Sequence, residues 1–195
     1  MKRKIVLCLA LVVLLALVWF TASSPPKAAA FNHTWELLTA TNIAGGEYGL
    51  WDDIASGMGK KNEAALFWFI NNDAADEELQ YKTTDVTVNT NAHPILKASI
   101  DLSDYGFAYV GYSTATTGNC EYPAALQWLA VDARKGYVTK SFTLPTNVVI
   151  QMVCIWLDDT PDNIATGRSN ALIDYIRIES AGGAIGWREE FKGPP

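Results

Sequence analysis

Short segments rich in Val, Ile, Leu and aromatic residues recur along the chain, separated by Gly, Asn, Asp, Pro and Ser. In several of them apolar and polar residues alternate, which is the period of a half-buried strand, and no helical periodicity of useful length follows residue 30. The expected strands span residues 65–70, 85–90, 95–102, 107–113, 126–131, 137–144, 148–157 and 172–179. Many short strands with turn residues between them predict an all-β fold, an antiparallel β-sandwich of jelly-roll topology.

The margins of this pattern are less regular. Residues 35–41 fit a weak amphipathic helix, and residues 42–62, rich in Gly, Asp and Ser, are expected to form a loop. The glycine-rich residues 181–186 are expected to be a linker that ends a β-sandwich module of residues 31–180. Residues 187–195 (WREEFKGPP) are either a tail strand that pairs with a sheet edge or the start of a second domain that is missing from this chain. We favour the second interpretation.

The N-terminal 30 residues have the pattern of an export signal. A basic start is followed by an unbroken apolar run over residues 5–20 and by small and polar residues up to Ala30. This order predicts a secretory signal peptide, and a signal anchor is the alternative. Both interpretations place the rest of the chain outside the cytoplasm, so an extracellular location is expected.

The charge of the chain narrows the choice of partners. Residues 1–30 hold four of the 15 basic residues and none of the 21 acidic ones, so the remainder carries 11 basic and 21 acidic residues, a net charge of −10. Such a surface repels nucleic acid and anionic membranes, and it suits neutral ligands or cations. We therefore expect no nucleic-acid partner and no membrane contact beyond the leader.

The chemistry needed for catalysis is poorly supplied. The chain has two histidines, no Gly-x-Ser-x-Gly nucleophile motif and no glycine-rich phosphate loop. Its close carboxylate pairs are adjacent residues, which point to opposite faces of a strand and make poor acid–base pairs. The sequence therefore favours a non-catalytic protein.

Two of the three cysteines lie outside the leader. Cys120 lies in a polar loop and Cys154 in an apolar strand. An even pair in an exported chain favours a Cys120–Cys154 disulfide over two free thiols.

Asp174 lies within the last expected strand, ALIDYIRIES, where strict alternation places it on the more apolar face with Leu172, Ile176 and Ile178. A buried carboxylate costs several kcal/mol unless it is paired, hydrogen-bonded or bound to a metal. Hydrogen bonds from backbone N–H groups, an ion pair and a structural Ca²⁺ all remain open. The side chains considered as partners, basic for an ion pair and acidic for a shared Ca²⁺, are Arg168, Arg177, Glu36 and Glu47.

The remaining signal is the aromatic content, with seven Trp, eight Tyr and seven Phe. Sugars stack their flat C–H faces on exposed rings while their hydroxyls meet amides and carboxylates, so binding surfaces mix these residue types. We expect Phe67, Phe69, Trp128 and Trp156 to pack between the sheets. The candidates for ligand contact, which are aromatic or polar residues near loop ends, are Trp51, Tyr105, Tyr109, Tyr112, Tyr122 and Asn119.

The stretch TKSFTLPTNVVIQMVCIWLDD, with ALIDYIRIES after it, resembles the C-terminal half of carbohydrate-binding-module-like jelly rolls of galactose-binding-like architecture. These accessory domains belong to secreted glycan-active proteins. The resemblance implies that Asp174 is a candidate ligand of a structural calcium near the two chain ends. WREEFKGP resembles the opening strand of laminarinase-type glycoside hydrolases, which implies an enzyme domain as C-terminal partner.

The sequence therefore predicts an extracellular, non-catalytic module that binds a poly- or oligosaccharide or mediates adhesion. Two alternatives remain open: a cell-surface domain for protein–protein contact without a sugar site, and a small glycoside hydrolase or lyase on the same sandwich.

Overall fold

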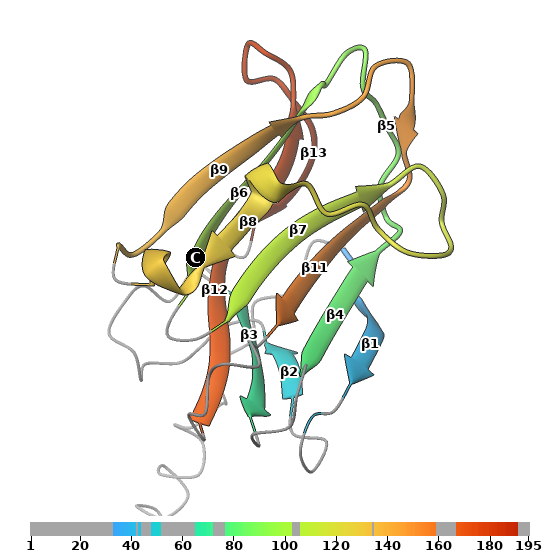
Figure 1. Cartoon of the computed structure of the whole chain (residues 1–195). Helices are drawn as coiled ribbons and strands as arrows, with labels where there is room; N and C mark the ends of the chain where they lie inside the picture. The colour runs from blue at the N-terminus through green and yellow to red at the C-terminus, as the bar shows by residue number, and fades with distance from the viewer. Residues whose placement is uncertain are drawn as a thin grey trace, which may run out of the picture.

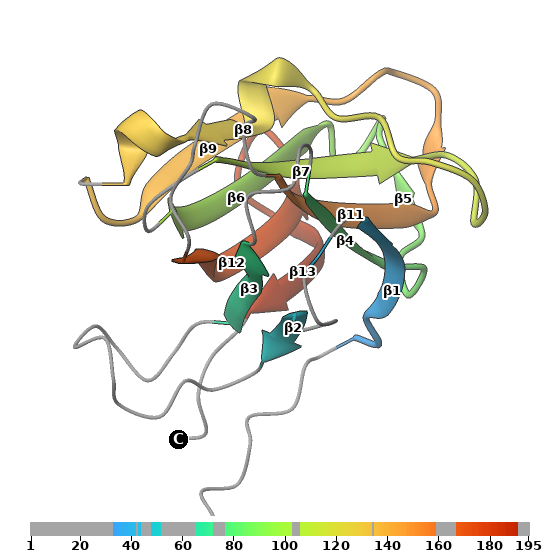
Figure 2. The same ribbon diagram turned by 60° about the horizontal axis from the view of Figure 1, so that its bottom comes forward.

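The computed structural model describes residues 33–41, 43, 48–51, 65–71, 77–102, 106–133, 135–158 and 167–190. Two antiparallel sheets form its layers, and they lie face to face (Figure 1 and Figure 2). Among these residues, no helix is long and apolar enough to cross a membrane.

The strands of the first layer, here called sheet A, are in spatial order β1 (Glu36–Thr41), β4 (Glu78–Thr83), β11 (Met152–Asp158), β7 (Phe107–Ser113) and β8 (Gln127–Leu129). Sheet B contains β2 (Tyr48–Trp51), β3 (Ala65–Asn71), β12 (Gly167–Glu179), β6 (Ile95–Leu102) and β9 (Val138–Thr143), with β13 (Ile185–Glu190) also paired to β12. A separate small ribbon joins β5 (Val88–Asn89) to β10 (Val149–Ile150). Two 3₁₀ turns, η2 (Ala124–Leu126) and η3 (Ala130–Asp132), flank β8.

The chain passes repeatedly from one sheet to the other. The successive pairs β3 and β4, β6 and β7, β8 and β9, and β11 and β12 each have one member in each sheet. This connectivity is that of a jelly roll, and all recorded strand pairs are antiparallel. The predicted fold class is confirmed.

The expected helix over residues 35–41 is wrong. This segment forms β1, which pairs with the edge strand β4 and places Leu37 opposite Tyr81. Sheet pairing satisfies its backbone groups and outweighs a weak local helical pattern. The expected loop over residues 42–62 also contains a strand, β2, and β4 itself was not predicted.

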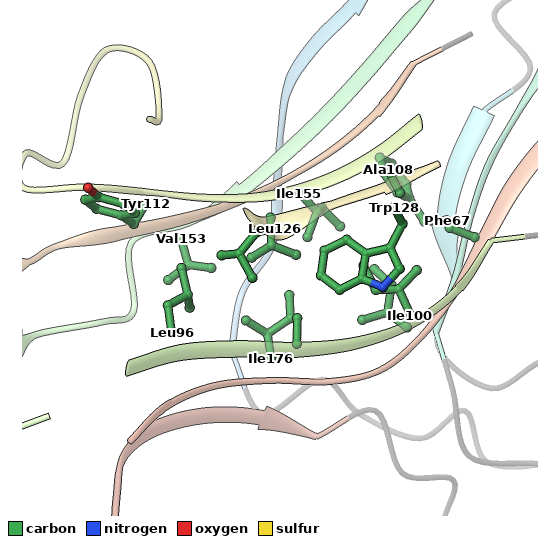
Figure 3. Close-up of a cluster of buried hydrophobic side chains, with 14 of the residues drawn as sticks. Phe67, Leu96, Ile100, Ala108, Tyr112, Leu126, Trp128, Val153, Ile155 and Ile176 are labelled. Carbon is green, nitrogen blue, oxygen red and sulfur yellow. The ribbon is translucent and has the colours of Figure 1, made fainter. Parts of the chain in front are cut away.

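The core lies between the sheets and is filled from both by alternate residues. Val153 and Ile155 point inward from β11, and Leu96, Ile100 and Ile176 point inward from sheet B (Figure 3). The fully buried Trp128 of β8 lies among them, and its indole N–H donates to the Val138 carbonyl over 2.8 Å.

Asp174 marks a β-bulge in β12. Ile173 pairs with Ile100 and Tyr175 pairs with Ser99, so Asp174 is an extra residue between two consecutive pairs. The bulge reverses the alternation. Ala171 and Ile173 are core residues before it, and Ile176 and Ile178 are core residues after it.

The assignment of Asp174 to the apolar face is therefore wrong. The carboxylate does not share the inward side with Ile176, because the bulge shifts the phase of the strand. Asp174 is half-buried and has a partner in the structure. Its charge, after burial, helps to raise the pKa of Tyr137 to about 12. Tyr137 packs against the small cluster of Leu66, Trp68 and Leu172, separate from the main core.

The expected linker and domain boundary near residue 180 are corrected as well. β13 pairs with β12 from Tyr175 to Glu179. Trp187 belongs to the main core, and its indole N–H donates to the Asp85 carbonyl over 2.8 Å. Residues 185–190 are thus part of the sandwich, as the tail-strand alternative has it. Residues 191–195 lie outside the described part of the chain.

A buried carboxylate ties the segment before β1 to the last strand. Glu189 is fully buried, and its Oε2 accepts hydrogen bonds from the His33 backbone N–H at 3.1 Å and from the Trp35 indole N–H at 3.0 Å. His33 also stacks on Trp187, with ring centroids 4.9 Å apart. We call this arrangement the Glu189 clasp.

Replacing Glu189 with alanine is expected to lower the free energy of unfolding by about 2–3 kcal/mol, because two buried donors lose a charged acceptor. Urea unfolding of the purified chain measures the loss. The matched control is Glu190→Ala on the same strand. Glu190 forms ion pairs with the partly exposed Arg177 and the exposed Arg188, so its loss should cost less than about 1 kcal/mol. Equal losses in the two variants would contradict a special role for Glu189.

Candidate functional site

Four strands of sheet A bring a row of alternating-face residues together on the outer surface. Trp156 of β11 lies directly opposite Gln80 of β4 on one side and Tyr109 of β7 on the other. Tyr109 in turn lies opposite Gln127 of β8. The core residues Ile155, Leu157 and Val110 point the other way, so this row of an amide, two rings and an amide faces outward (Figure 1).

Four rings gather on this surface, and we call them the aromatic face: Phe107, Tyr109, Tyr122 and Trp156. Tyr109 and Trp156 are stacked, with centroids 4.9 Å apart and an interplanar angle of 22°. The Tyr122 ring lies 5.2 Å from Trp156 and 6.1 Å from Tyr109. Phe107 meets Tyr109 edge-on at 6.2 Å. All four side chains are half-buried, so each keeps part of its surface in water.

Amide side chains border the aromatic face on both sides. The Gln127 amide donates to the Tyr109 hydroxyl, and the Tyr122 hydroxyl donates to Gln80 Oε1 over 3.5 Å. The Trp156 indole N–H is buried, and no hydrogen-bond acceptor for it is found in the described part of the chain. These groups provide donors and acceptors beside the rings.

The two tyrosine hydroxyls remain protonated at neutral pH. Burial raises the pKa of Tyr109, the charge of Asp158 raises it further, and the hydrogen bond with Gln127 lowers it in part. Burial raises the pKa of Tyr122 as well, and Glu78 adds to the shift. Each hydroxyl therefore keeps its proton and can act as a hydrogen-bond donor.

Tyr122 is held on the aromatic face by three features of the loop that carries it. A disulfide joins Cys120 to Cys154, with Cα atoms 6.3 Å apart, and Cys154 lies two residues before Trp156 on the same side of β11. Glu121 exchanges backbone hydrogen bonds of 2.8 and 3.0 Å with Tyr112. A Cβ on Gly111 would lie 2.7 Å from the Tyr122 ring, so a glycine is needed for the ring to lie over β7.

The predicted ligand residues are placed unequally. Tyr109 and Tyr122 meet on the aromatic face. Asn119 is exposed in the loop before Cys120. Tyr112 is 2% exposed and points into the core, because it lies one residue out of phase with the outward Tyr109 and Gly111, and we remove it from the candidates. Trp51 ends β2 in sheet B and stays a prediction apart from this face.

Tyr105 lies outside the described residues. Two residues of the aromatic face were missed: Trp156 was assigned to the core, and Phe107 was not singled out. The signal was present in the alternation of β11, where Val153, Ile155 and Leu157 point inward and Trp156 falls in phase with Cys154 and Asp158. A tryptophan in phase with a carboxylate is expected on the solvent side.

The predicted metal ligands are not gathered by the described strands. Glu36 is exposed at the start of β1 in sheet A, and Asp174 lies on β12 in sheet B. Glu47 lies outside the described residues. Within the described ranges, no group of three or more His, Cys, Asp or Glu could hold a metal ion. Calcium binding stays a prediction.

No family model matches the chain, and no curated protein matches it. Among solved structures, it is similar to two carbohydrate-binding modules. TmCBM27, studied for specific mannan recognition, is 12% identical, covers 79% of this chain over 97% of its own and gives a TM-score of 0.42. The low-affinity xylan-binding module CBM86 from Roseburia intestinalis is 13% identical, covers 77% over 99% and gives 0.37.

An enzyme is also among the similar structures. The arabinose-bound α-L-arabinofuranosidase MgGH51 is 11% identical, covers 74% of this chain over 23% of its own and gives a TM-score of 0.41. Since these identities and TM-scores are low, we base the function on the chemistry of the aromatic face.

Proposed function

We propose that this chain is a carbohydrate-binding module that holds a poly- or oligosaccharide on the aromatic face of sheet A. The observation that carries the proposal is the outward row in which the stacked Trp156 and Tyr109 rings have Gln80 on one side and Gln127 on the other. Half-buried rings beside amides are the two halves of sugar recognition on one surface.

The chemistry of a sugar matches this row. The axial C–H groups of a pyranose form an apolar patch that gains free energy when it covers an aromatic surface. The hydroxyls around the ring need donors and acceptors at its edge, because a desolvated hydroxyl without a partner costs about 1–3 kcal/mol. The amides of Gln80 and Gln127 and the hydroxyls of Tyr109 and Tyr122 supply both kinds.

The rigidity of the surface also favours this function. The rings stand on strands of the sandwich, and Tyr122 is fixed by the disulfide beside it. A ligand therefore meets rings that are already ordered, which lowers the entropy lost on binding. The wider proposal is a non-catalytic, extracellular module that works beside a glycan-active enzyme. Its supports are the export-signal pattern of residues 1–30 and the scarcity of catalytic motifs.

Replacing Trp156 with alanine is expected to weaken polysaccharide binding about 30-fold, because a central ring is lost and Tyr109 loses its stacking partner. Retention of the purified chain on a panel of insoluble and soluble polysaccharides identifies the ligand, and calorimetry on the best one measures the change. The matched control is Tyr175→Ala in sheet B, which removes a ring that lies under the Arg177 guanidinium in the other sheet. Its affinity should equal that of the unchanged protein.

Two outcomes would count against the proposal. A folded protein that is retained by no polysaccharide of the panel would overturn it and favour a protein partner. Equal losses for Trp156→Ala and Tyr175→Ala would move the site away from the aromatic face. A parallel series with calcium and with EDTA tests the predicted metal, since binding that EDTA abolishes would require an ion.

A further inference from the structure

Two carboxylates face each other at one end of the aromatic face. Asp158, the last residue of β11, lies directly opposite Glu78, the first residue of β4. On its other side Asp158 lies opposite Phe107. Along each strand these carboxylates are two residues from Trp156 and Gln80, so they share the outward side with them. The acidic pair thus forms the row next to the ring-and-amide row.

From this arrangement we propose that the aromatic face selects sugars that carry a positively charged amine, in preference to neutral and anionic sugars. The inference rests on the proposed carbohydrate binding and names the class of sugar. An amino-sugar unit combines the apolar C–H patch of a pyranose with an ammonium group. The rings receive the first, and the Glu78–Asp158 pair receives the second.

The opposed pair itself favours a cation. Like charges directly opposite each other in an antiparallel pair destabilise a sheet, with Cβ atoms about 4.5–5.5 Å apart. A neutral sugar leaves that repulsion in place, an anionic one adds to it, and an ammonium group between the two carboxylates relieves it. Lys82, the basic residue of β4, lies four residues from Glu78, about 13 Å along the strand, so it is too far away to replace the ligand charge.

The negative charge acts at the rings where the ligand would lie. After burial, the Asp158 charge is the next contribution to the raised pKa of Tyr109, and the Glu78 charge is the next contribution for Tyr122. Each carboxylate is therefore close enough to influence one tyrosine of the aromatic face. Aromatic rings attract cations through their negative faces, so the rings and the carboxylates favour the same ligand charge.

The experiment compares two ligands that differ in charge and share a backbone. Chitosan oligosaccharides carry free amines that are protonated in mildly acidic buffer, and chitin oligosaccharides of the same length carry neutral N-acetyl groups. We expect the full chain to bind the chitosan oligosaccharide about tenfold more tightly, with a preference that shrinks as salt is added. An oligogalacturonate of equal length should bind more weakly than either.

Three variants locate the preference. Glu78→Gln and Asp158→Asn should each reduce it to about threefold or less, because each removes one charge of the pair. Glu190→Gln removes a carboxylate from β13 in sheet B and should leave it at tenfold. Thermal unfolding of each variant checks its fold, and Glu78→Gln with the salt series decides the matter if Asp158→Asn is unstable.

The failure of this inference and the failure of carbohydrate binding give different results. Equal affinity for the chitosan and chitin oligosaccharides, or a preference that all three variants retain, overturns the amino-sugar selection and leaves the module intact. Binding of no sugar of any charge by the folded protein overturns both.

Discussion

Replacing Trp128 with alanine is expected to lower the free energy of unfolding by about 3–5 kcal/mol, one of the two largest effects foreseen for this chain. Trp128 is fully buried between the sheets, near Ile100 and Ile155 (Figure 3). Its removal leaves a cavity that the surrounding strands fill only partly. The Val138 carbonyl also loses the indole donor, and the Lys140 ammonium loses the ring that lies 5.5 Å away.

Chemical denaturation monitored by circular dichroism measures this loss from the midpoint and slope. The control is Trp156→Ala, which removes the same side chain from the half-buried outer surface of sheet A, and it should cost clearly less. A second variant, Trp128→Phe, keeps much of the volume and should recover part of the loss. A Trp128→Ala protein within about 1 kcal/mol of the unchanged one would contradict the central position of this residue.

Removing the disulfide with Cys120→Ser and Cys154→Ser together is expected to cost about 3–4 kcal/mol, because the bond closes a loop between cysteines separated by 34 residues. It should also weaken polysaccharide binding by roughly twofold to tenfold. Tyr122 would then be held by the Glu121–Tyr112 hydrogen bonds and its ring contacts alone, and binding would have to order its loop.

The two effects are measured separately. Urea unfolding gives the change in stability, and calorimetry at a temperature where both forms are folded gives the change in affinity. Reduction of the unchanged protein should reproduce both effects, whereas the same reductant should change nothing in the double variant, which has no bond to break. Unchanged affinity after reduction would show that the strand contacts alone fix Tyr122.

Much of the fold could be predicted because a strand buried on one side records its orientation in an alternating pattern. The sequence of β11 shows this, since Val153, Ile155 and Leu157 are all core residues. β1 and β4 were missed because the pattern there is weak, with Leu37 exposed at 43% and Tyr81 only partly buried. In these strands pairing along the sheet edge decides the structure, and pairing leaves no local signature.

The bulge at Asp174 shows a second limit. One inserted residue reverses the phase of every position after it, so two halves of β12 that look continuous in sequence have different inward sets. A polar residue in an apolar phase can mean a buried partner or a change of phase, and local sequence does not separate the two.

The candidate site was predicted only in part because it depends on register between distant strands. Tyr109 and Tyr122 are close in sequence and were expected together. Trp156 comes from a strand more than 30 residues further along the chain, and Gln80 from one nearly 30 residues earlier. The row exists because β4, β11, β7 and β8 align these four positions, and that alignment is a property of the folded sheet.

The Glu189 clasp bears on how fast the chain folds. It joins residues separated by 156 positions, and β3 pairs with β12 across a similarly long stretch of chain. Contact order is therefore high, which predicts refolding in the range of milliseconds to seconds with little structure retained by early fragments. During synthesis, the first strands to emerge cannot acquire their final partners until β12 and β13 follow. A chain destined for export thus stays translocation-competent, because the residues that complete its sandwich are among the last to be made.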